Sequence, residues 1–387
     1  MSDASTNKIF GLDLRATDSA LSFNLTSAAL YRYALPLLQT LDTRSGDLVR
    51  REGLILLLRD NEDHVGLGEI SPLPGFSDES LALALSRTVQ ILQKMVGSAD
   101  YLTQFLARGG DWEEMGKPSV ANFGIETALL SLLANSNHLD LGSLLFGSSS
   151  KRIPVNGLIN AELAEWVPLA LELVDAGYST LKIKVGKINS ELEAIGVQSI
   201  RDAVGPEVNI RLDANRSWSL EEAIQFGKSV RSSDIEFIEE PLSNPVDLPV
   251  FYDESGTHFA FDETLHHILD PGISFQSYTG LAALVIKPTL VACVPRILDL
   301  IKQAREQGIK VVISSSYETD IGLMNLAQFA AGVSGEEITT GLGTYGLYSK
   351  HLSSVSLAPQ KGWVSIQSLD VEDLELDSCE LVYENHV

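Results

Sequence analysis

The sequence contains very little cysteine and no long hydrophobic run. Cys293 and Cys379 are its only cysteines, too few for a disulfide framework or a thiolate metal site. The longest apolar stretches, such as LILLL from Leu54 and LALAL from Leu81, are far shorter than the ~20 residues that span a bilayer. The polar start MSDASTNKIFGLD has neither the basic nor the apolar region of a signal peptide. We therefore expect a soluble protein of the reducing cytoplasm with no membrane partner.

Basic residues are also scarce relative to acidic ones. The chain carries 28 lysines and arginines against 52 aspartates and glutamates, a formal net charge of -24. Because an acidic surface repels phosphate, this balance argues against nucleic acid as a partner. Hydrophobic residues make up 44% of the 387 residues, enough for one large barrel or two domains with sizeable cores. The composition does not determine the oligomeric state.

The chain changes character near residue 150. Before this point it reads as strands and a loop rich in glycine and proline, followed by helices predicted over residues 81–95 and 123–134, which indicates an α+β domain. After it, short apolar segments alternate with amphipathic helical ones, and eight such segments favour a closed (β/α)8 barrel. The alternative is an open doubly wound sheet, but no glycine-rich phosphate motif follows the first strand. The eight predicted strands are PVNGLI, STLKIKVG, NIRLDAN, EFIEEP, HFAFDE, ALVIKP, KVVISSS and EITTGL.

Charged residues recur at the C-terminal ends of these predicted strands. In STLKIKVG, Lys182 and Lys184 alternate with aliphatic residues, so both lysines share one face of the strand. In a barrel this face points inward, and the C-terminal ends of the strands form the end where active sites are assembled. The same parity directs a charged residue near the C-terminal end of each of the next four strands toward the interior: Asp213, Glu239, Asp262 and Lys287. Arg211 shares the inward face with Asp213.

Three carboxylates on adjacent strands would repel one another unless a cation lay among them. Ligation by oxygen alone favours a hard divalent ion, Mg²⁺ first and Mn²⁺ second. A lysine beside such an ion and a second lysine has its neutral form favoured, so it can remove a proton adjacent to a carboxylate. Any one of these positions would ordinarily be a surface group, but five with compatible parity are difficult to obtain by chance.

Several neighbouring polar residues fit this pattern less well. Glu240, Glu263 and Asp320 have the wrong parity or no clear role, which favours helix caps or residues that support the ligands. His266 and His267 follow a strand without an obvious carboxylate partner, and we expect them to be bystanders.

These residues resemble motifs of the enolase superfamily, in its muconate-lactonizing-type subgroup. The motifs KIKVG, RLDAN, FIEEP, FDET and VIKP occur in the order of that subgroup's lysine, metal and second-lysine motifs. Within the subgroup the chain is most similar to the o-succinylbenzoate synthase family, through GEISPLPGFSDES from Gly68 and VVISSSYETDIGL from Val311. The resemblance covers about residues 29–350.

The resemblance implies a modified (β/α)8 TIM barrel with an α+β capping domain built from the N-terminal part and the C-terminal tail. It divides the chain into an extension of unknown role, a capping domain, the barrel and a returning segment: 1–28, 29–150, 151–345 and 346–387. Asp213, Glu239 and Asp262 would bind Mg²⁺, Lys184 would be the general base, and Lys287 would lie across the substrate ring. The implied reaction is the syn dehydration of 2-succinyl-6-hydroxy-2,4-cyclohexadiene-1-carboxylate to o-succinylbenzoate in menaquinone biosynthesis.

Further residues are candidates for contacts with this small carboxylate substrate. We expect Lys182 to tune Lys184 or to contact a carboxylate, and Arg211 either to do the same or to form a buried structural pair. Ser314 and Ser316 share one parity and either bind the succinyl carboxylate or pack as small residues at a strand end. The remaining candidates are Asn215, Gly341, which either admits a ligand or ends a strand, and Phe76, which lies in a lid loop or a plain turn.

Other functions use the same acids and lysines. N-acylamino acid racemases and dipeptide epimerases place the two lysines on opposite faces of one carbon, and the scaffold alone does not choose between these reactions. A dipeptide epimerase would be expected to show an Asp-x-Asp pair near Ser314, which SSSYETD does not present. A catalytically silent binding protein is a further alternative, and the intact lysines and acids argue against it.

Overall fold

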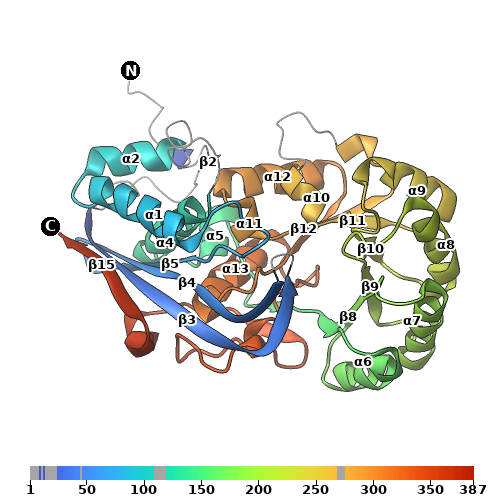
Figure 1. The fold of residues 1–387 in the computed structure, drawn as a ribbon. Coiled ribbons are helices and arrows are strands. Elements are labelled where there is room, and N and C mark those ends of the chain that lie inside the picture. The colour runs from blue at the N-terminus through green and yellow to red at the C-terminus, as the bar shows by residue number, and fades with distance from the viewer. Residues whose placement is uncertain (1–7, 10–11, 14–23, 44–45, 109–118, 268–274) are drawn as a thin grey trace.

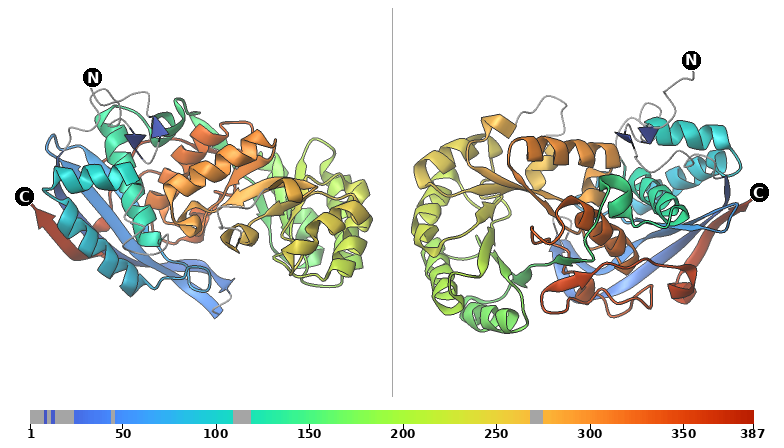
Figure 2. Two further views of the ribbon diagram at one scale, coloured as in Figure 1. Left: turned by 90° about the horizontal axis from the view of Figure 1, so that it is seen from above. Right: turned by 180° about the vertical axis from the view of Figure 1, so that it is seen from behind.

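The computed structural model describes residues 8–9, 12–13, 24–43, 46–108, 119–267 and 275–387 (Figure 1). Two lobes lie side by side, an N-terminal lobe with an antiparallel sheet and a lobe of parallel strands with helices outside them (Figure 2). This architecture confirms the predicted barrel with a capping domain. In the part of the chain that is described, no helix is both long enough and apolar enough to cross a membrane.

The capping domain is built on a four-stranded antiparallel sheet in the order β15-β3-β4-β5. Strands β3 (Leu25–Thr43), β4 (Gly46–Asp60) and β5 (Val65–Ile70) follow one another along the chain. β15 (Glu380–His386) comes from the C-terminal end and pairs with β3. The C-terminal tail thus completes the first domain, as the resemblance implies. A separate two-stranded ribbon joins β1 (Lys8–Ile9) to β2 (Leu12–Asp13).

Helices cover the capping sheet closely. Helices α1 (Leu81–Met95) and α4 (Val120–Ser136) contact its strands, whereas α2 (Ala99–Arg108) packs beside α1 and α5 (Leu141–Phe146) packs beside α4. The two central helices that the sequence predicts over 81–95 and 123–134 are therefore α1 and α4. Helix α4 is buried on nearly all sides, which an apolar sequence without one polar face requires. Its backbone approaches β5 so closely that a Cβ on Gly66 would lie 2.1 Å from the carbonyl oxygen of Ala128.

The barrel contains a seven-stranded parallel sheet in the order β13-β12-β11-β10-β9-β8-β7. Its strands are short and almost fully buried, because helices cover the outside and side chains fill the inside. They are β7 (Gly157–Ile159), β8 (Thr180–Lys184), β9 (Asn209–Asp213), β10 (Phe237–Glu239), β11 (Phe259–Phe261), β12 (Leu281–Ile286) and β13 (Lys310–Ile313). Seven of the eight predicted strands are thus present.

The eighth predicted strand, EITTGL, is not a regular strand, and this part of the prediction is wrong. Thr340 donates its amide to the carbonyl of Pro154 at 2.8 Å, and Gly341 donates to Ile313 at 2.9 Å. These two residues form isolated parallel bridges to Val155 and Ser314. Thr340 therefore pairs with the chain just before β7, at one edge of the seven-stranded sheet, and Gly341 pairs with the end of β13, at the other edge. The barrel closes through these single bridges rather than through a continuous ladder of hydrogen bonds.

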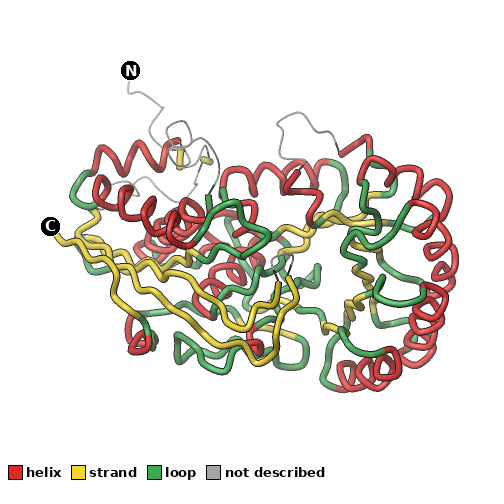
Figure 3. The backbone as a smooth tube through the Cα atoms, viewed as in Figure 1, coloured by secondary structure: helices red, strands yellow, loops and turns green. Residues whose placement is uncertain are grey.

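Helices surround the barrel in an arc (Figures 1 and 3). The connections run through α6 (Trp166–Asp175), α7 (Ser190–Val204), α8 (Leu220–Val230), α9 (Leu248–Ser255), α10 (Glu263–His267), α11 (Pro288–Val291), α12 (Val294–Glu306) and α13 (Asp320–Val333). Helix α8 begins with a capping box between Ser219 and Glu222, which satisfies two backbone donors that would otherwise lack partners. A small ribbon of β6 (Arg152–Pro154) and β14 (Trp363–Ser365) ties the tail to the start of the barrel.

Glu69 on β5 joins the capping domain to the barrel. Its buried carboxylate accepts hydrogen bonds from the amides of Thr319 and Gly322 at 3.0 Å each and from the Thr319 hydroxyl at 2.6 Å. These donors lie at the N-terminal end of α13, where free amides and the helix dipole favour a negative charge. The Tyr33 hydroxyl donates to the same carboxylate at 2.7 Å. The helix that follows the seventh barrel strand is therefore capped by a residue of the other domain.

The contact between β5 and α4 leads to a stability prediction. Gly66→Ala should lower the free energy of unfolding by about 1–3 kcal/mol, because the new methyl group overlaps the Ala128 carbonyl and the Leu132 side chain. Gly346→Ala is the matched control, since nothing lies within 4 Å of its Cβ position, and it should change stability by less than about 0.5 kcal/mol. Urea unfolding of both variants measures the difference, and equal midpoints would contradict the close packing.

Candidate active site

Three carboxylates meet at the C-terminal ends of three adjacent strands. Asp213 ends β9, Glu239 ends β10, and Asp262 follows β11. The parallel register places Glu239 opposite Asp213 on one side and opposite Ala260 on the other. All three acids are at most 2% exposed. The parity prediction for these strands thus brings the three acids into one buried cluster.

Lysine ammonium groups lie among these carboxylates. Lys182 Nζ is 2.8 Å from oxygens of both Asp213 and Glu239, and Lys184 Nζ is 2.6 Å from Asp213. Lys287, after β12, forms an ion pair with Asp262. The lysines approach from both sides of the acid cluster, because β8 and β12 flank the three strands that carry the acids.

The close packing of these charges shifts their pKa values strongly. Burial alone would raise the pKa of Asp213, but Lys182 and Lys184 outweigh burial and hold that pKa well below its usual range. Burial would likewise lower the pKa of Lys182, and the charges of Asp213 and Glu239 raise it instead. Glu239 behaves differently, since burial together with the negative charge of Asp213 raises its pKa to about 8. Glu239 is therefore the acid whose ionised form most needs additional positive charge.

This donor set fits a hard divalent cation. Carboxylate oxygens are the ligands that Mg²⁺ and Mn²⁺ prefer, and a divalent charge would relieve the repulsion that raises the pKa of Glu239. Among the described residues no three acidic, histidine or cysteine side chains already form a closed set of metal ligands. The carboxylate oxygens that would bind the cation already form ion pairs, those of Asp213 and Glu239 with Lys182 and that of Asp262 with Lys287. A bound cation would therefore have to displace these ammonium groups.

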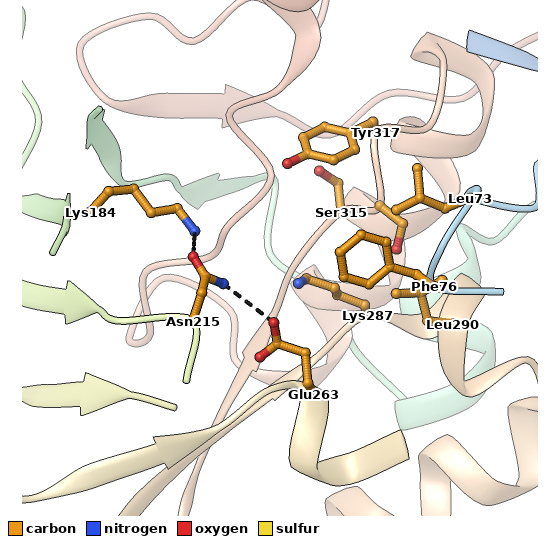
Figure 4. A pocket seen from close by; sticks show the side chains of 10 residues that line it. Leu73, Phe76, Lys184, Asn215, Glu263, Lys287, Leu290, Ser315 and Tyr317 are labelled. Carbon is orange, nitrogen blue, oxygen red and sulfur yellow. Dashed lines mark hydrogen bonds between the residues drawn. The ribbon is translucent and has the colours of Figure 1, made fainter. Parts of the chain in front are cut away.

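A pocket of about 370 Å³ opens beside the cluster, between the two domains (Figure 4). The ammonium ends of Lys184 and Lys287 point toward each other across it. Asn215 connects the two sides of its floor, accepting from Lys184 at 2.6 Å and donating to Glu263 at 3.3 Å. The remaining wall is lined by Leu73, Phe76, Leu290, Ser315, Ser316 and Tyr317.

The predicted substrate contacts divide into two groups. Asn215, Phe76 and Ser316 line the pocket. Ser314 and Gly341 do not, because they face each other in the bridge that closes the barrel, where a Cβ on Gly341 would lie 2.4 Å from Ser314 Oγ. Ser314 thus has the position expected from the alternative of small-residue packing at a strand end, and Gly341 lies in an isolated bridge rather than at the end of a regular eighth strand.

Arg211 and Lys182 also lie outside the pocket wall. Arg211 forms an ion pair with Glu236 at 2.6 Å and donates to the carbonyl of Thr339 at 2.7 Å. This buried pairing was the structural alternative that the sequence left open. Lys182 instead bridges two carboxylates of the acid cluster, so it contacts the candidate metal ligands rather than the pocket.

The neighbouring acids have definite positions. Glu240 accepts from the amides of Asp262 and Thr264 at 2.7 and 2.6 Å, which fixes the backbone that carries Asp262. Asp320 accepts from the amides of Leu352 and Ser353 and so anchors the C-terminal segment. Both support surrounding structure, as the sequence favours. The side chains of His266 and His267 lie outside the described residues.

Several residues of the pocket wall are not predicted as pocket residues by the sequence. The sequence favours a supporting role for Glu263, yet this residue lines the pocket. Ser315, Tyr317 and Leu290 were not identified, because they lie beyond the strand ends, where alternation no longer predicts direction. Tyr317 has a backbone φ of 61°, and no local sequence signal indicates a left-handed conformation at a tyrosine.

The position of Arg211 can be tested by separating stability from binding. Arg211→Met should lower the free energy of unfolding by about 1–3 kcal/mol, because the Thr339 carbonyl and one oxygen of Glu236 lose their donor. KM for the cyclohexadiene carboxylate implied by the family resemblance should stay within about twofold. Urea unfolding and steady-state kinetics measure both quantities. A raised KM with unchanged stability would contradict the structural role and indicate that Arg211 contacts the substrate.

Family comparisons match both domains. Residues 165–368 match the family described as "Enolase C-terminal domain-like", and residues 25–132 match "MenC, N-terminal domain". The o-succinylbenzoate synthase of Aliivibrio fischeri is 31% identical over 368 residues, which cover 93% of this chain and 100% of that protein. The similarity therefore spans the capping domain and the barrel together.

Solved structures share the fold at lower identity. The L-Ala-D/L-Glu epimerase from Bacillus subtilis has a TM-score of 0.77 at 21% identity, covering 92% of this chain and 100% of the epimerase. The dipeptide epimerase from Enterococcus faecalis, complexed with Mg and the dipeptide L-Leu-L-Tyr, has a TM-score of 0.74 at 20% identity and covers 91% and 99% of the two chains. At this identity the likeness concerns the fold and does not distinguish the reactions.

Proposed function

The chain belongs to the o-succinylbenzoate synthase family of the enolase superfamily, and on this basis we propose that it is the hydro-lyase that makes o-succinylbenzoate. The substrate would be 2-succinyl-6-hydroxy-2,4-cyclohexadiene-1-carboxylate, and the reaction a syn dehydration for menaquinone biosynthesis. The wall of the pocket supports this proposal most directly. It presents two lysines, two serines and apolar side chains to a ligand that carries two carboxylates and a six-membered ring.

The metal in this proposal is Mg²⁺, with Mn²⁺ as a substitute. Asp213, Glu239 and Asp262 would hold it, in keeping with the magnesium named for the Enterococcus faecalis epimerase complex. When bound, the cation would supply positive charge to the substrate carboxylate, whose oxygens take up electron density as the adjacent proton leaves. The three acids orient that charge, because β9, β10 and β11 are locked in register.

Lys184 is the proposed base. Its ammonium is held by Asp213 and Asn215 at the edge of the pocket, and the side chain is 23% exposed. The neutral amine removes the ring proton beside the carboxylate, and the resulting ammonium returns that proton to the departing hydroxyl. One C–H bond and one C–O bond break on the same face, the ring becomes aromatic, and water leaves.

Lys287 lies on the other side of the pocket and acts through its charge. Burial alone would lower the pKa of Lys287, but Asp262 and Glu239 outweigh burial and raise it, which favours the cationic form of this side chain while no metal binds those carboxylates. A fixed cation over the face of the ring stabilises the negative charge that develops after proton removal. No proton transfer from Lys287 is required for dehydration, whereas racemization needs a second lysine that exchanges protons.

The acids of the SSSYETD segment argue against a dipeptide substrate. A dipeptide carries an ammonium group that needs carboxylate partners, yet Glu318 accepts from the amide of Ser316 at 2.7 Å and Asp320 binds two amides of the C-terminal segment. Glu263 is the one carboxylate on the described pocket wall, and burial together with repulsion from Asp262 raises its pKa. The wall therefore favours an anionic substrate without an ammonium group.

The metal assignment predicts a loss of Mg²⁺ binding in Glu239→Gln. Mg²⁺ at about 100 times its Kd should stabilise the wild type by ~2.7 kcal/mol. The variant should lose both this stabilisation and Mg²⁺-dependent product formation while remaining folded without metal, because the amide keeps the shape and removes one repelling charge. Thermal unfolding with and without Mg²⁺ tests this, with exposed Asp299→Asn as control. Undiminished turnover in Glu239→Gln would remove the metal assignment.

The base assignment predicts that Lys184→Ala stops proton removal. Turnover and α-proton exchange with deuterated water should fall by about 10²–10⁴-fold, the usual contribution of a positioned general base. Lys187→Ala is the control on the same segment, since this lysine is exposed and bonded to Asn160. NMR of substrate in deuterated water measures the exchange. Exchange at the native rate in Lys184→Ala would place the base elsewhere.

Lys287→Arg separates dehydration from racemization. The variant keeps the positive charge but cannot readily exchange a proton, so dehydration should fall less than racemization of N-succinyl amino acids. Both activities are measured on the same purified preparations with Mg²⁺. Equal collapse of the two would count against a purely electrostatic role. Absence of turnover on every substrate in the wild type would instead favour a binding protein.

A further inference from the structure

Arg51 on β4 is the largest fully buried side chain of the described structure, with 1% exposure. Its guanidinium lies deep in the capping domain and donates mainly to main-chain carbonyls of two other segments. Nη2 and Nη1 donate to Ser71 and Pro72 at 2.6 and 2.7 Å, and Nη2 and Nε donate to Ser316 and Tyr317 at 3.3 and 3.2 Å. A longer contact of 3.5 Å joins Nη1 to the carbonyl of the adjacent Glu52.

The two segments that Arg51 joins form opposite parts of the pocket wall. Ser71 and Pro72 lead directly into the loop that places Leu73 and Phe76 in the pocket. Ser316 and Tyr317 are themselves wall residues contributed by the barrel. One side chain therefore fixes the capping loop and the barrel loop relative to each other, although the segments are more than two hundred residues apart in the chain.

The barrel loop needs such support, because its backbone is strained. Tyr317 has a φ of 61°, in the left-handed region that a bulky side chain disfavours. Its carbonyl accepts from Arg51 and from the hydroxyl of Tyr348 at 2.5 Å. Tyr348 belongs to the segment after the barrel, so two regions outside the loop hold its conformation. Tyr317 and Ser315 of this loop both line the pocket (Figure 4).

We propose that Arg51 is a positioning residue for substrate recognition, with Tyr348 as its auxiliary. It acts by holding the 71–76 loop and residues 316–317 in the one arrangement that fits the end of the substrate remote from the metal ligands. This inference rests on the proposed function only for the identity of the substrate. The arrangement of the two loops can be tested without any turnover.

Arg201 provides a matched control for the loss of a buried arginine. It lies on α7, is 9% exposed, and also donates to four main-chain carbonyls, those of Gly205, Val208, Ser233 and Asp234. None of these residues lines the pocket. Replacing either arginine by lysine keeps the charge but removes the planar fork that reaches two segments at once.

Kinetics distinguish positioning from general stability. Arg51→Lys should lower kcat/KM for the cyclohexadiene substrate by about 10- to 100-fold, as expected for a wall displaced by about 1 Å, with most of the change in KM. Arg201→Lys should leave kcat/KM within about twofold even though it also lowers Tm. Tyr348→Phe, which removes one hydroxyl, should show a smaller change in the same direction. The same kinetic change in both lysine variants, assayed at equal intervals below Tm, would overturn the proposal.

Hydrogen exchange tests the same coupling independently of activity. Arg51→Lys should speed amide exchange in two separate peptides, one covering residues 68–77 and one covering 314–319, whereas Arg201→Lys should leave both peptides unchanged. Faster exchange in only one peptide, or in neither, would overturn the coupling. If the wild type fails to dehydrate the cyclohexadiene carboxylate, the proposed function fails, and this measurement still decides the role of Arg51. If Arg51→Lys does not fold, both measurements are made on Tyr348→Phe instead: KM for the substrate and the rate of amide exchange in the 314–319 peptide.

Discussion

The arrangement of charge at the end of three barrel strands constrains everything else in this protein. Asp213, Glu239 and Asp262 are buried side by side because parallel strands in register bring their ends together. Buried carboxylates at this spacing are tolerated only with compensating charge, which lysines from the two flanking strands provide. Lys184 and Lys287, which pair with Asp213 and Asp262, also line the pocket, so the charges that compensate the acids face any ligand bound there.

Both domains contribute residues to the candidate site. The barrel supplies the acids and lysines, and the capping domain supplies Leu73 and Phe76 to the pocket wall. Such a division requires a fixed relation between the domains, and buried polar contacts provide it where apolar packing alone would allow sliding. Glu69 caps α13, and Arg51 ties both loops of the wall. Both residues come from neighbouring strands of the capping sheet, so the sheet acts as the common support.

The sequence predicted what depends on local periodicity and missed what depends on distant contacts. Alternation along each strand located the three acids and the lysines, because direction within a strand follows from position alone. The same rule failed for EITTGL, whose residues bridge opposite edges of the sheet, and for Ser315 and Tyr317, which lie past a strand end. Arg211 obeyed the rule and points inward, but parity does not tell the catalytic end of a strand from its other end. The hydrogen bonds of Arg51 could not be predicted from the sequence, because their acceptors are main-chain carbonyls of segments far away in the chain.

Residues beyond the acids and lysines shape the rest of the pocket wall. The loop after β13 both contributes residues to the pocket wall and anchors the C-terminal segment. Glu318 and Asp320 bind backbone amides that shape the loop and anchor the tail. Both residues are 2% exposed and neither lines the pocket, so they do not face an ammonium group there. Tyr317 is held in a strained conformation by donors from outside the loop. A wall of different shape would therefore require this loop to be rebuilt together with its supports, because substitutions at the lysines leave the loop unchanged.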